Sequence, residues 1–381
     1  MANTLTNLIP TLYRAVDTVS RELTGMIPSV TLFPDAEQAA VGQSITYPVT
    51  APQAPVDIVP GAVADTAGNQ FVGNATMLIS KSRMVPVKWN GEEQVGISQM
   101  YDRVLEQQFA QAMRALTNEI EADLCALYKE GSRAYGSVGQ MPFTLEGDFT
   151  DATLAKKILL DNGAPTSGLK MVVGTTAGAY LTGRQATFRI QGDREMLTQG
   201  VIRDIEGMAI RQSSAIKTHM PGTGAGYLVN DTFTPATNPQ DGSLMIRLDT
   251  GTGTILAGDI VTVAGSANKY VVSSDFTAPY LTLAGPSRQI AAIADNAAIT
   301  PVGGYTANML FHESAIHLLT KLPAMPQGGD SADDVEVITD PISGLSFQVA
   351  LYRERRQIRY EIGVAWGVKA VKPAHIALLI Q

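Results

Sequence analysis

An uninterrupted stretch without proline or glycine, from Ser98 to Lys129, constrains the fold of this 381-residue chain more than any other feature. Its apolar residues recur at intervals of three and four, which is the period of one helix face: Tyr101, Leu105, Phe109, Ala112, Leu116, Ile120, Leu124 and Leu127. Ser98 is a suitable N-cap, and Gly131 follows the last polar turn. At 1.5 Å per residue the predicted helix is about 45 Å long. It is longer than the usual helix of a globular domain and would act as a rigid spine.

Composition favours a folded protein rich in turns. Hydrophobic residues make up 45% of the chain and charged residues 17%, which supplies packed cores and excludes a disordered chain. A net charge of −8 argues against nucleic-acid binding by the chain as a whole. A single cysteine, Cys125, excludes a disulfide framework and suits a reducing cytoplasm. We expect no secretory signal and no membrane span, because no sufficiently long apolar run occurs.

The N-terminal quarter predicts a helix followed by a projecting loop. Apolar spacing indicates an amphipathic helix over residues 4–24, which is ended by Gly25 and Pro28. Prolines then exclude helix from Pro34 to Pro60, while Ser44–Val49 and Thr76–Lys88 are rich in β-branched residues. The polar stretch between them is too long for an ordinary connection. We predict two long strands joined by an extended, hairpin-like loop.

The middle of the chain predicts a mixed domain interrupted by an all-β insertion. Residues 150–218 alternate between helix and strand, at Ala152–Asn162 (capped by Thr150 or Asp151), Leu169–Gly174, Thr175–Thr182 and Met208–Ser213. After a glycine-rich hinge at Pro221–Gly226, short strands with turn residues between them indicate a small barrel or sandwich: Leu244–Leu248, Asp259–Val263, Tyr270–Ser274 and Tyr280–Leu283. Leu310–Leu319 is predicted to return to helix. The chain then ends in strands at Ser346–Tyr352, Ile358–Ala365, Val368–Val371 and Ile376–Ile380.

Three patterns resemble catalytic or ligand-binding motifs, and none has the spacing its chemistry needs. His312 and His317 are five residues apart, which places them about 140° apart on a helix, so a zinc-protease site is not expected. Gly222–Gly226 resembles a dinucleotide loop, but no helix is predicted after it to receive a pyrophosphate. Cys125 is expected to be a core thiol. We therefore predict no catalytic residue, no metal site and no cofactor.

The densest basic cluster is Arg353, Arg355, Arg356 and Arg359. On one strand, residues 353, 355 and 359 would share a face. Two functional interpretations stand beside an ordinary solvated strand: contact with DNA, and pairing with acidic groups of the same chain or of a neighbouring chain. The interleaved Glu354 favours pairing.

The last quarter of the chain resembles the coat proteins of short-tailed phages whose capsid subunit carries an inserted β-barrel. The resemblance rests on three stretches, residues 308–317 (NMLFHESAIH), 343–349 (SGLSFQV) and 360–373 (YEIGVAWGVKAVKP). The order of an N-terminal arm, extended loop, spine helix, interrupted mixed domain and closing strands is similar to the Johnson (Hong Kong ninety-seven) fold of tailed-phage capsid subunits. The fold class expected is therefore α+β, with a long spine helix, an extended β loop, axial and peripheral domains and an inserted all-β domain.

The resemblance implies a division of the chain into an N-terminal arm (1–33), an extended loop with flanking strands (34–89), a peripheral domain with the spine helix (90–135), a first axial part (136–218), an inserted β-barrel-like domain (219–303), a second axial part (304–342) and closing peripheral strands (343–381). It implies a virion protein, made in the host cytoplasm, that self-assembles as pentamers and hexamers in an icosahedral shell. The shell would form with a scaffolding protein and a portal, enclose double-stranded DNA and mature by concerted expansion. The N-terminal helix would be the place for the scaffolding protein.

Two other classes remain open at this stage. One is a soluble cytoplasmic enzyme with an accessory β domain, which lacks a readable arrangement of nucleophile and base. The other is a different virion component, such as a decoration or tail-tube protein, which the long helix and extended loop disfavour.

Overall fold

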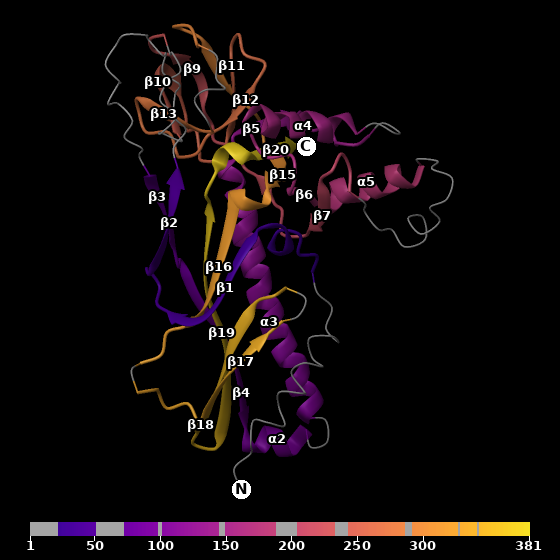
Figure 1. Cartoon of the computed structure of the whole chain (residues 1–381), viewed down its shortest axis with the longest axis vertical. Helices are drawn as coiled ribbons and strands as arrows, with labels where there is room; N and C mark the ends of the chain where they lie inside the picture. Colours follow the sequence, from indigo (N-terminus) through magenta and orange to yellow (C-terminus); the bar gives the residue numbers. More distant parts are fainter. Residues whose placement is uncertain are drawn as a thin grey trace, which may run out of the picture.

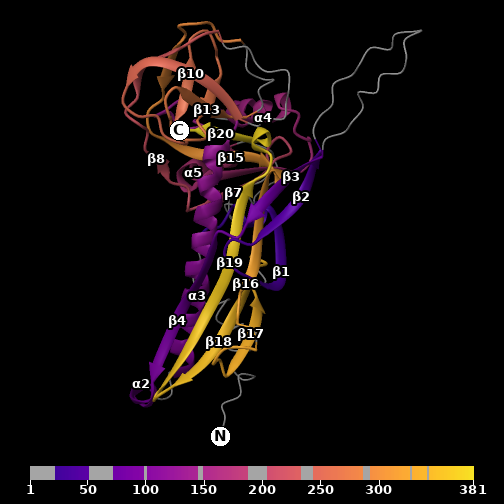
Figure 2. The ribbon, with the colours of Figure 1, turned by 90° about the vertical axis from the view of Figure 1, so that its left-hand side faces the viewer.

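The computed structural model describes residues 22–50, 72–97, 101–144, 149–187, 204–232, 243–285, 292–326, 328–340 and 343–381. The molecule is elongated (Figures 1 and 2), with a globular β unit at one end and a long helix and long strands that taper toward the other. None of the described helices is long and apolar enough to cross a membrane.

The predicted spine helix is present as α3 (Tyr101–Cys125), which tightens into the 3-10 turn η4 (Ala126–Glu130). Over its described residues α3 is about 37 Å long, and it ends earlier than expected because the last turn leaves the α geometry. The predicted apolar stripe is confirmed, since the side chains from Leu105 to Leu124 in that stripe are at most 2% exposed. The expected N-cap Ser98 lies outside the described residues.

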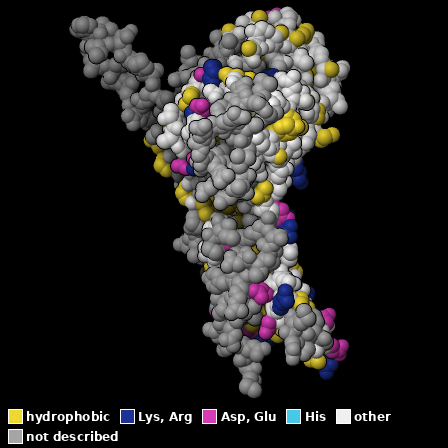
Figure 3. All heavy atoms as spheres, turned by 90° about the vertical axis from the view of Figure 1, so that its right-hand side faces the viewer, with side chains coloured by type: hydrophobic (Ala, Val, Ile, Leu, Met, Phe, Trp, Pro, Cys, Tyr) yellow, Lys and Arg dark blue, Asp and Glu magenta, His cyan; other side chains and the backbone are white. Residues whose placement is uncertain are grey.

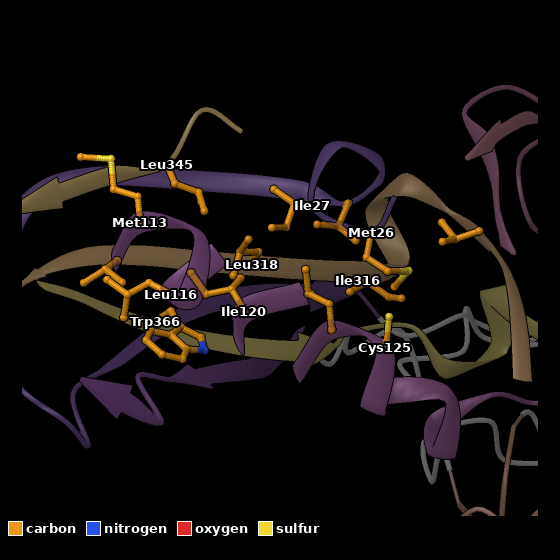
Figure 4. Close-up of a cluster of buried hydrophobic side chains, with 14 of the residues drawn as sticks. Met26, Ile27, Met113, Leu116, Ile120, Cys125, Ile316, Leu318, Leu345 and Trp366 are labelled. Atoms are coloured by element: carbon orange, nitrogen blue, oxygen red, sulfur yellow. The ribbon is translucent and has the colours of Figure 1, made fainter. Parts of the chain in front are cut away.

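The helix packs against a six-stranded sheet. Its strands are β1 (Thr31–Ala39), β4 (Lys81–Asn90), β16 (Ile316–Pro323), β17 (Asp334–Thr339), β18 (Ser346–Glu354) and β19 (Gln357–Ala370). The long strand β19 pairs with β18 and β16 along one edge and with β4 along the other. Figure 4 shows the resulting core, in which Trp366, Leu318 and Leu345 of the sheet side meet Leu116 and Ile120 of the helix.

The extended loop follows strand β1 of this sheet in the chain. Strands β2 (Ser44–Thr50) and β3 (Val72–Leu78) form a separate antiparallel pair in continuous register. The hairpin-like arrangement is therefore confirmed for its described strands, while its tip lies outside the described residues. The expected long second strand is broken at Ile79 and Ser80, so β3 and β4 are two elements.

A second, twelve-stranded sheet forms the wide end of the molecule. Its mixed part contains β5 (Arg133–Gly136), β6 (Leu169–Gly174), β7 (Ala209–Ser213), β8 (Thr218–His219), β15 (Tyr305–His312) and β20 (Ile376–Ile380), with helices α4 (Thr150–Asp161) and α5 (Thr175–Thr187). The core between α4, α5 and this sheet is separate from the spine core. The predicted alternation of helix and strand over 150–218 is confirmed.

The remaining strands close into a small barrel. They are β9 (Ala225–Val229), β10 (Ser243–Thr252), β11 (Ile260–Val263), β12 (Lys269–Val271), β13 (Tyr280–Ala284) and β14 (Ala298–Pro301). They pair in the order β13-β10-β9-β14-β11-β12, and a bridge from Val272 to Leu283 joins the last strand to the first. The barrel has its own apolar core. The chain enters and leaves it at a paired position, His219 opposite Tyr305, as an insertion requires.

Two local predictions are wrong. Leu310–Leu319 is not a helix: it spans the end of β15, the 3-10 turn η6 (Glu313–Ala315) and the start of β16. Both strands are central in their sheets and nearly continuously buried, so the segment lacks the alternation that marks a strand. The cap of α4 is Phe149, without a side-chain bond. The Asp151 carboxylate instead accepts a hydrogen bond from the Phe143 backbone N–H at 3.0 Å.

At the N-terminus, residues 22–25 are not helical, and the rest of the predicted helix lies outside the described residues. The expected domain boundaries remain predictions. Strand pairing shows that β16 and β17 share a sheet with the closing strands β18 and β19, whereas β20 lies in the other sheet.

Candidate intersubunit surfaces and the contacts that position them

The base of the β2–β3 hairpin is fixed against β19 by a close backbone approach. A Cβ on Gly367 would lie 2.0 Å from the Leu78 carbonyl oxygen, so no larger residue fits there. The Ser80 N–H donates to the Trp366 carbonyl at 3.0 Å, and Lys369 Nζ donates to the Thr76 carbonyl at 2.6 Å. The strands of the hairpin thus project from a rigid base.

A charged cluster joins this base to the spine helix. Lys81 Nζ lies 2.8 Å from Asp123 Oδ1 and 3.1 Å from Glu119 Oε1, and the Trp366 indole N–H donates to Asp123 Oδ2 at 2.9 Å. These partners raise the pKa of Lys81, above all through the Asp123 hydrogen bond. The lysine therefore stays charged and ties β4 to α3.

A buried carboxylate on α3 holds the segment that precedes β1. The Glu121 side chain is 1% exposed. It accepts three backbone hydrogen bonds, from Gly25 and Met26 at 2.7 Å each and from Ile27 at 3.0 Å. These N–H groups open the 3-10 turn η2 (Ile27–Ser29) and would otherwise lack acceptors. Met26 and Ile27 then enter the core beside Ile120 (Figure 4).

A second carboxylate fastens the same segment at the surface of the helix. Glu22 pairs with the Arg114 guanidinium, Nε to Oε2 at 2.6 Å, and also accepts from Asn118 Nδ2 at 2.6 Å. The Arg114 hydrogen bond is the main reason that the pKa of Glu22 falls to about 2. The chain is thus pinned to α3 at two places.

The joint between barrel and body contains a buried polar cluster. His219 Nε2 lies 2.8 Å from Asp259 Oδ1, and Tyr128 Oη lies 2.7 Å from His219 Nδ1. Asp259 is fully buried and also accepts from the Leu256 N–H at 2.7 Å. Burial raises the pKa of Tyr128, so its hydroxyl remains a donor. The three side chains come from η4, β8 and the barrel, so the cluster fixes the barrel to the end of the spine.

The predicted arginine cluster is split by a turn. Arg355 and Arg356 form the turn between β18 and β19, and pairing places Arg353 opposite Ile358 and Arg359 opposite Tyr352. Since adjacent residues of a strand face opposite ways, Arg353 and Arg359 lie on different faces. The prediction of one shared face for residues 353, 355 and 359 is therefore wrong.

The members of the cluster also differ in their partners. Arg359 Nε lies 3.1 Å from Glu361 and 3.3 Å from Glu354, and its guanidinium stacks over the Tyr352 ring at 4.9 Å. Arg353 Nε lies 3.5 Å from Asp333. Arg355 and Arg356 are exposed, and within the described residues neither makes an ion pair.

The other residues singled out in the sequence do not converge on a site. His312 ends β15 and lies 2.8 Å from the Ser314 hydroxyl, whereas His317 belongs to β16. The described residues contain no group of three or more potential metal ligands. The Gly222 N–H donates to Asp259. The glycine-rich segment that begins there leads into strand β9 and not into a helix. Cys125 is buried, and burial raises its thiol pKa to about 12.

Sequence reasoning missed Glu121 and the Tyr128–His219–Asp259 cluster. Glu121 carried one usable signal: a carboxylate next to Ile120, close to the buried face of the predicted spine helix. The cluster carried none, because its members are 91 and 40 residues apart in the sequence.

Comparison with known proteins reveals the fold. No protein-family profile and no curated protein matches the chain. Among solved structures, the capsid structure of cyanophage P-SCSP1u aligns over 95% of this chain and 89% of its own, with 13% identity and a TM-score of 0.50. This chain has the Johnson fold.

Two further similar structures come from bacteriophages. A chain of Mycobacterium phage Che8 aligns over 89% of this chain and 84% of its own, with 14% identity and a TM-score of 0.46. The mature capsid of bacteriophage PhiM1 aligns over 95% and 88%, with 8% identity and a TM-score of 0.45. In Johnson-fold terms, α3 is the spine helix, β2–β3 is the extended loop, and the barrel of β9–β14 is an insertion. The fold expected from the sequence is confirmed.

Proposed function

We propose that the chain is the major capsid protein of a tailed bacteriophage, the subunit that tiles the icosahedral head shell around double-stranded DNA. The observation that carries the proposal is the fold itself, which covers nearly all of the chain and of the cyanophage capsid subunit. Copies would assemble as pentamers and hexamers, with a scaffolding protein and a portal as partners.

The shape of the molecule supports this role. A lattice subunit needs several separate contact surfaces, and an elongated body with a projecting hairpin and a barrel provides them (Figure 2). The hairpin base at Gly367 and the joint at Asp259 hold these projections in fixed directions. In the assembled shell, the hairpin would lie over a neighbouring subunit. The end with α4 and α5 would gather at the five-fold and six-fold centres.

In this proposal, the large number of contacts between subunits governs both assembly and maturation of the shell. Weak contacts permit correction during growth, and many simultaneous contacts stabilise the closed lattice. Subunit interfaces with two packed arrangements would make the expansion of the shell concerted.

The enzyme alternative gains no support from the arrangement nearest to catalytic chemistry. A histidine between a carboxylate and a hydroxyl occurs at Tyr128–His219–Asp259, but His219 is 7% exposed and Asp259 is 0% exposed. A substrate would have no access to the imidazole, which instead joins three parts of the fold.

The proposal is tested by expressing the full chain alone and together with a scaffolding protein encoded beside it, followed by sedimentation and negative-stain electron microscopy. Closed particles tens of nanometres across, or extended sheets and tubes, are the expected products. A monodisperse monomer or small oligomer under both conditions would contradict the proposal.

A further inference from the structure

Two chain crossings join the two sheets at one place. The first runs from β15 through η6 into β16, and the second runs from β19 through the 3-10 turn η7 (Pro373–His375) into β20. They lie where the wide end meets the tapered part of the molecule (Figure 1), and the body narrows below that level (Figure 3). The Ala315 carbonyl at the end of η6 accepts from the Val371 N–H at 2.8 Å and from the Lys372 N–H at 3.3 Å. These backbone bonds tie one crossing to the other.

The first crossing is held by a histidine that has to be neutral at one nitrogen. His312 is the N-cap of η6, and its Nδ1 accepts from the Ser314 N–H at 3.2 Å. A nitrogen that accepts a hydrogen bond carries no proton. A proton on Nδ1 would bond to the Ser314 hydroxyl, 2.8 Å away, and would leave the Ser314 N–H without this acceptor. The turn that carries the Ala315 carbonyl is therefore capped only by the neutral imidazole.

The second crossing contributes a histidine that is poorly placed to carry a charge. The centroid of the His375 ring lies 6.4 Å from that of the His312 ring. Within the part of the chain that the structure describes, His375 Nδ1 is buried without a hydrogen-bond partner. Burial, and after it the charges of Lys372 and His312, lower the pKa of His375 below its ordinary 6.5. The stability that neutral His375 contributes is therefore present above pH 6.5 and lost as the pH falls through the lowered pKa.

Other titratable groups surround this histidine pair. Glu313 lies on η6, but its carboxylate is 52% exposed and already faces Lys170 of β6 at 3.7 Å. His317 lies on β16, and burial is the main cause that lowers its pKa. Glu130 lies on η4, which packs against β19 and β20, and burial raises the pKa of its carboxyl. The charged groups that act on His375 itself are cations, so protons added to the pair meet like charge.

We propose that the two crossings form a proton-sensitive joint between the sheets. Protonation of His312 and His375 removes the cap of η6, places like charges between the crossings and loosens the backbone bonds that tie them. Acid thereby frees the two sheets to change their relative orientation, whereas the neutral joint holds them fixed. This device belongs to the single folded chain and does not depend on the proposed function.

Hydrogen exchange of the unassembled full chain at about pH 7.5 and about pH 5 tests the joint, since histidine changes its charge between these values. After correction for the intrinsic effect of pH on exchange, protection of the Ser314 and Val371 amides should fall by about tenfold in acid, which is the effect of one pKa unit. The amides of Val261 and Val263, which belong to the separate barrel core, should keep their protection. Equal protection of Ser314 and Val371 at both pH values would overturn the proposal.

Variants separate the titration of the pair from the structure that it supports. His312→Asn keeps an acceptor at the capping position, because asparagine is a preferred N-cap residue, and it does not titrate. His375→Gln removes the second proton site. The double variant His312→Asn/His375→Gln should keep its protection in acid. His312→Ala, which has no cap, should lose protection at Ser314 at both pH values.

His317→Gln is the matched control, since this histidine lies beside the joint and does not cap η6. It should lose protection in acid as the wild-type chain does. Glu130 is unchanged in every variant, so its own titration does not account for a difference between them. A double variant that responds to acid like wild type, or a His317→Gln variant that no longer responds, would show that the pair is not the sensor. All of these measurements use the unassembled chain, so they are independent of whether it forms a shell.

Discussion

Replacing Glu121 should destabilise the subunit more than any other single carboxylate change on the spine helix. The carboxylate is buried and accepts three backbone hydrogen bonds from Gly25, Met26 and Ile27. A buried N–H without an acceptor costs about 1–3 kcal/mol. Glu121→Ala removes the acceptor of all three and should lower the free energy of unfolding by about 4 kcal/mol.

Glu121→Gln separates the charge from the shape of the side chain. The amide oxygen can still accept from Gly25 and Met26, but the amide nitrogen would face the Ile27 N–H, donor against donor. The expected loss is about 2 kcal/mol. Glu119→Ala is the matched control on the same helix. Its carboxylate is partly exposed and pairs with Lys81, so the loss should be about 0.5 kcal/mol.

Urea unfolding of the unassembled chain measures these differences, and hydrogen exchange at the amides of Gly25, Met26 and Ile27 locates them. Exchange at these amides should accelerate in both Glu121 variants and not in Glu119→Ala. If Glu121→Gln unfolds within about 0.5 kcal/mol of wild type with unchanged exchange, the reasoning about this anchor is refuted.

Three further predictions concern the hairpin base, the surface anchor and the buried thiol. Gly367→Ala places a Cβ against the Leu78 carbonyl and should cost about 2–4 kcal/mol in urea unfolding; Gly91→Ala, which meets nothing within 4 Å, should change stability by less than about 0.5 kcal/mol. The lowered pKa of Glu22 contributes stability that is present above its unfolded value of 4.5 and lost as the pH falls toward about 2; Arg114→Gln should weaken this part of the pH dependence, and an unchanged profile would count against the pair. Cys125, with a thiol pKa of about 12, should resist iodoacetamide at pH 8 in the folded chain and react after unfolding in urea; fast labelling of the folded chain would contradict its burial.

Periodic segments were predictable from the sequence. The stripe from Leu105 to Leu124 required a buried helix face, and the dense turns between residues 241 and 286 required short strands, which are present as a barrel. The prediction failed at Leu310–Leu319 because strands buried on both faces show neither alternation nor helical spacing. Helix α2 (Gly91–Ile97) was missed because it is only seven residues long.

The contacts that position the projections were largely beyond sequence reasoning. Gly367 sits inside a strand and is explained only by the Leu78 carbonyl, which comes from a segment distant in the chain. Asp259 and His219 are 40 residues apart in the sequence, and only the folded arrangement of the barrel on β8 brings them together. The basic cluster was visible in the sequence, but the turn at Arg355 and Arg356 decides which of its members pair within the chain and which remain exposed.

The central claim, that copies of this chain tile a closed shell, is tested most directly by cryo-electron microscopy of particles from the full-length chain produced with its scaffolding protein. The account predicts an icosahedral shell in which the ends bearing α4 and α5 meet at five-fold and six-fold centres, with each β2–β3 hairpin against a neighbouring subunit. Particles without that arrangement, or a chain that stays monomeric, would contradict it.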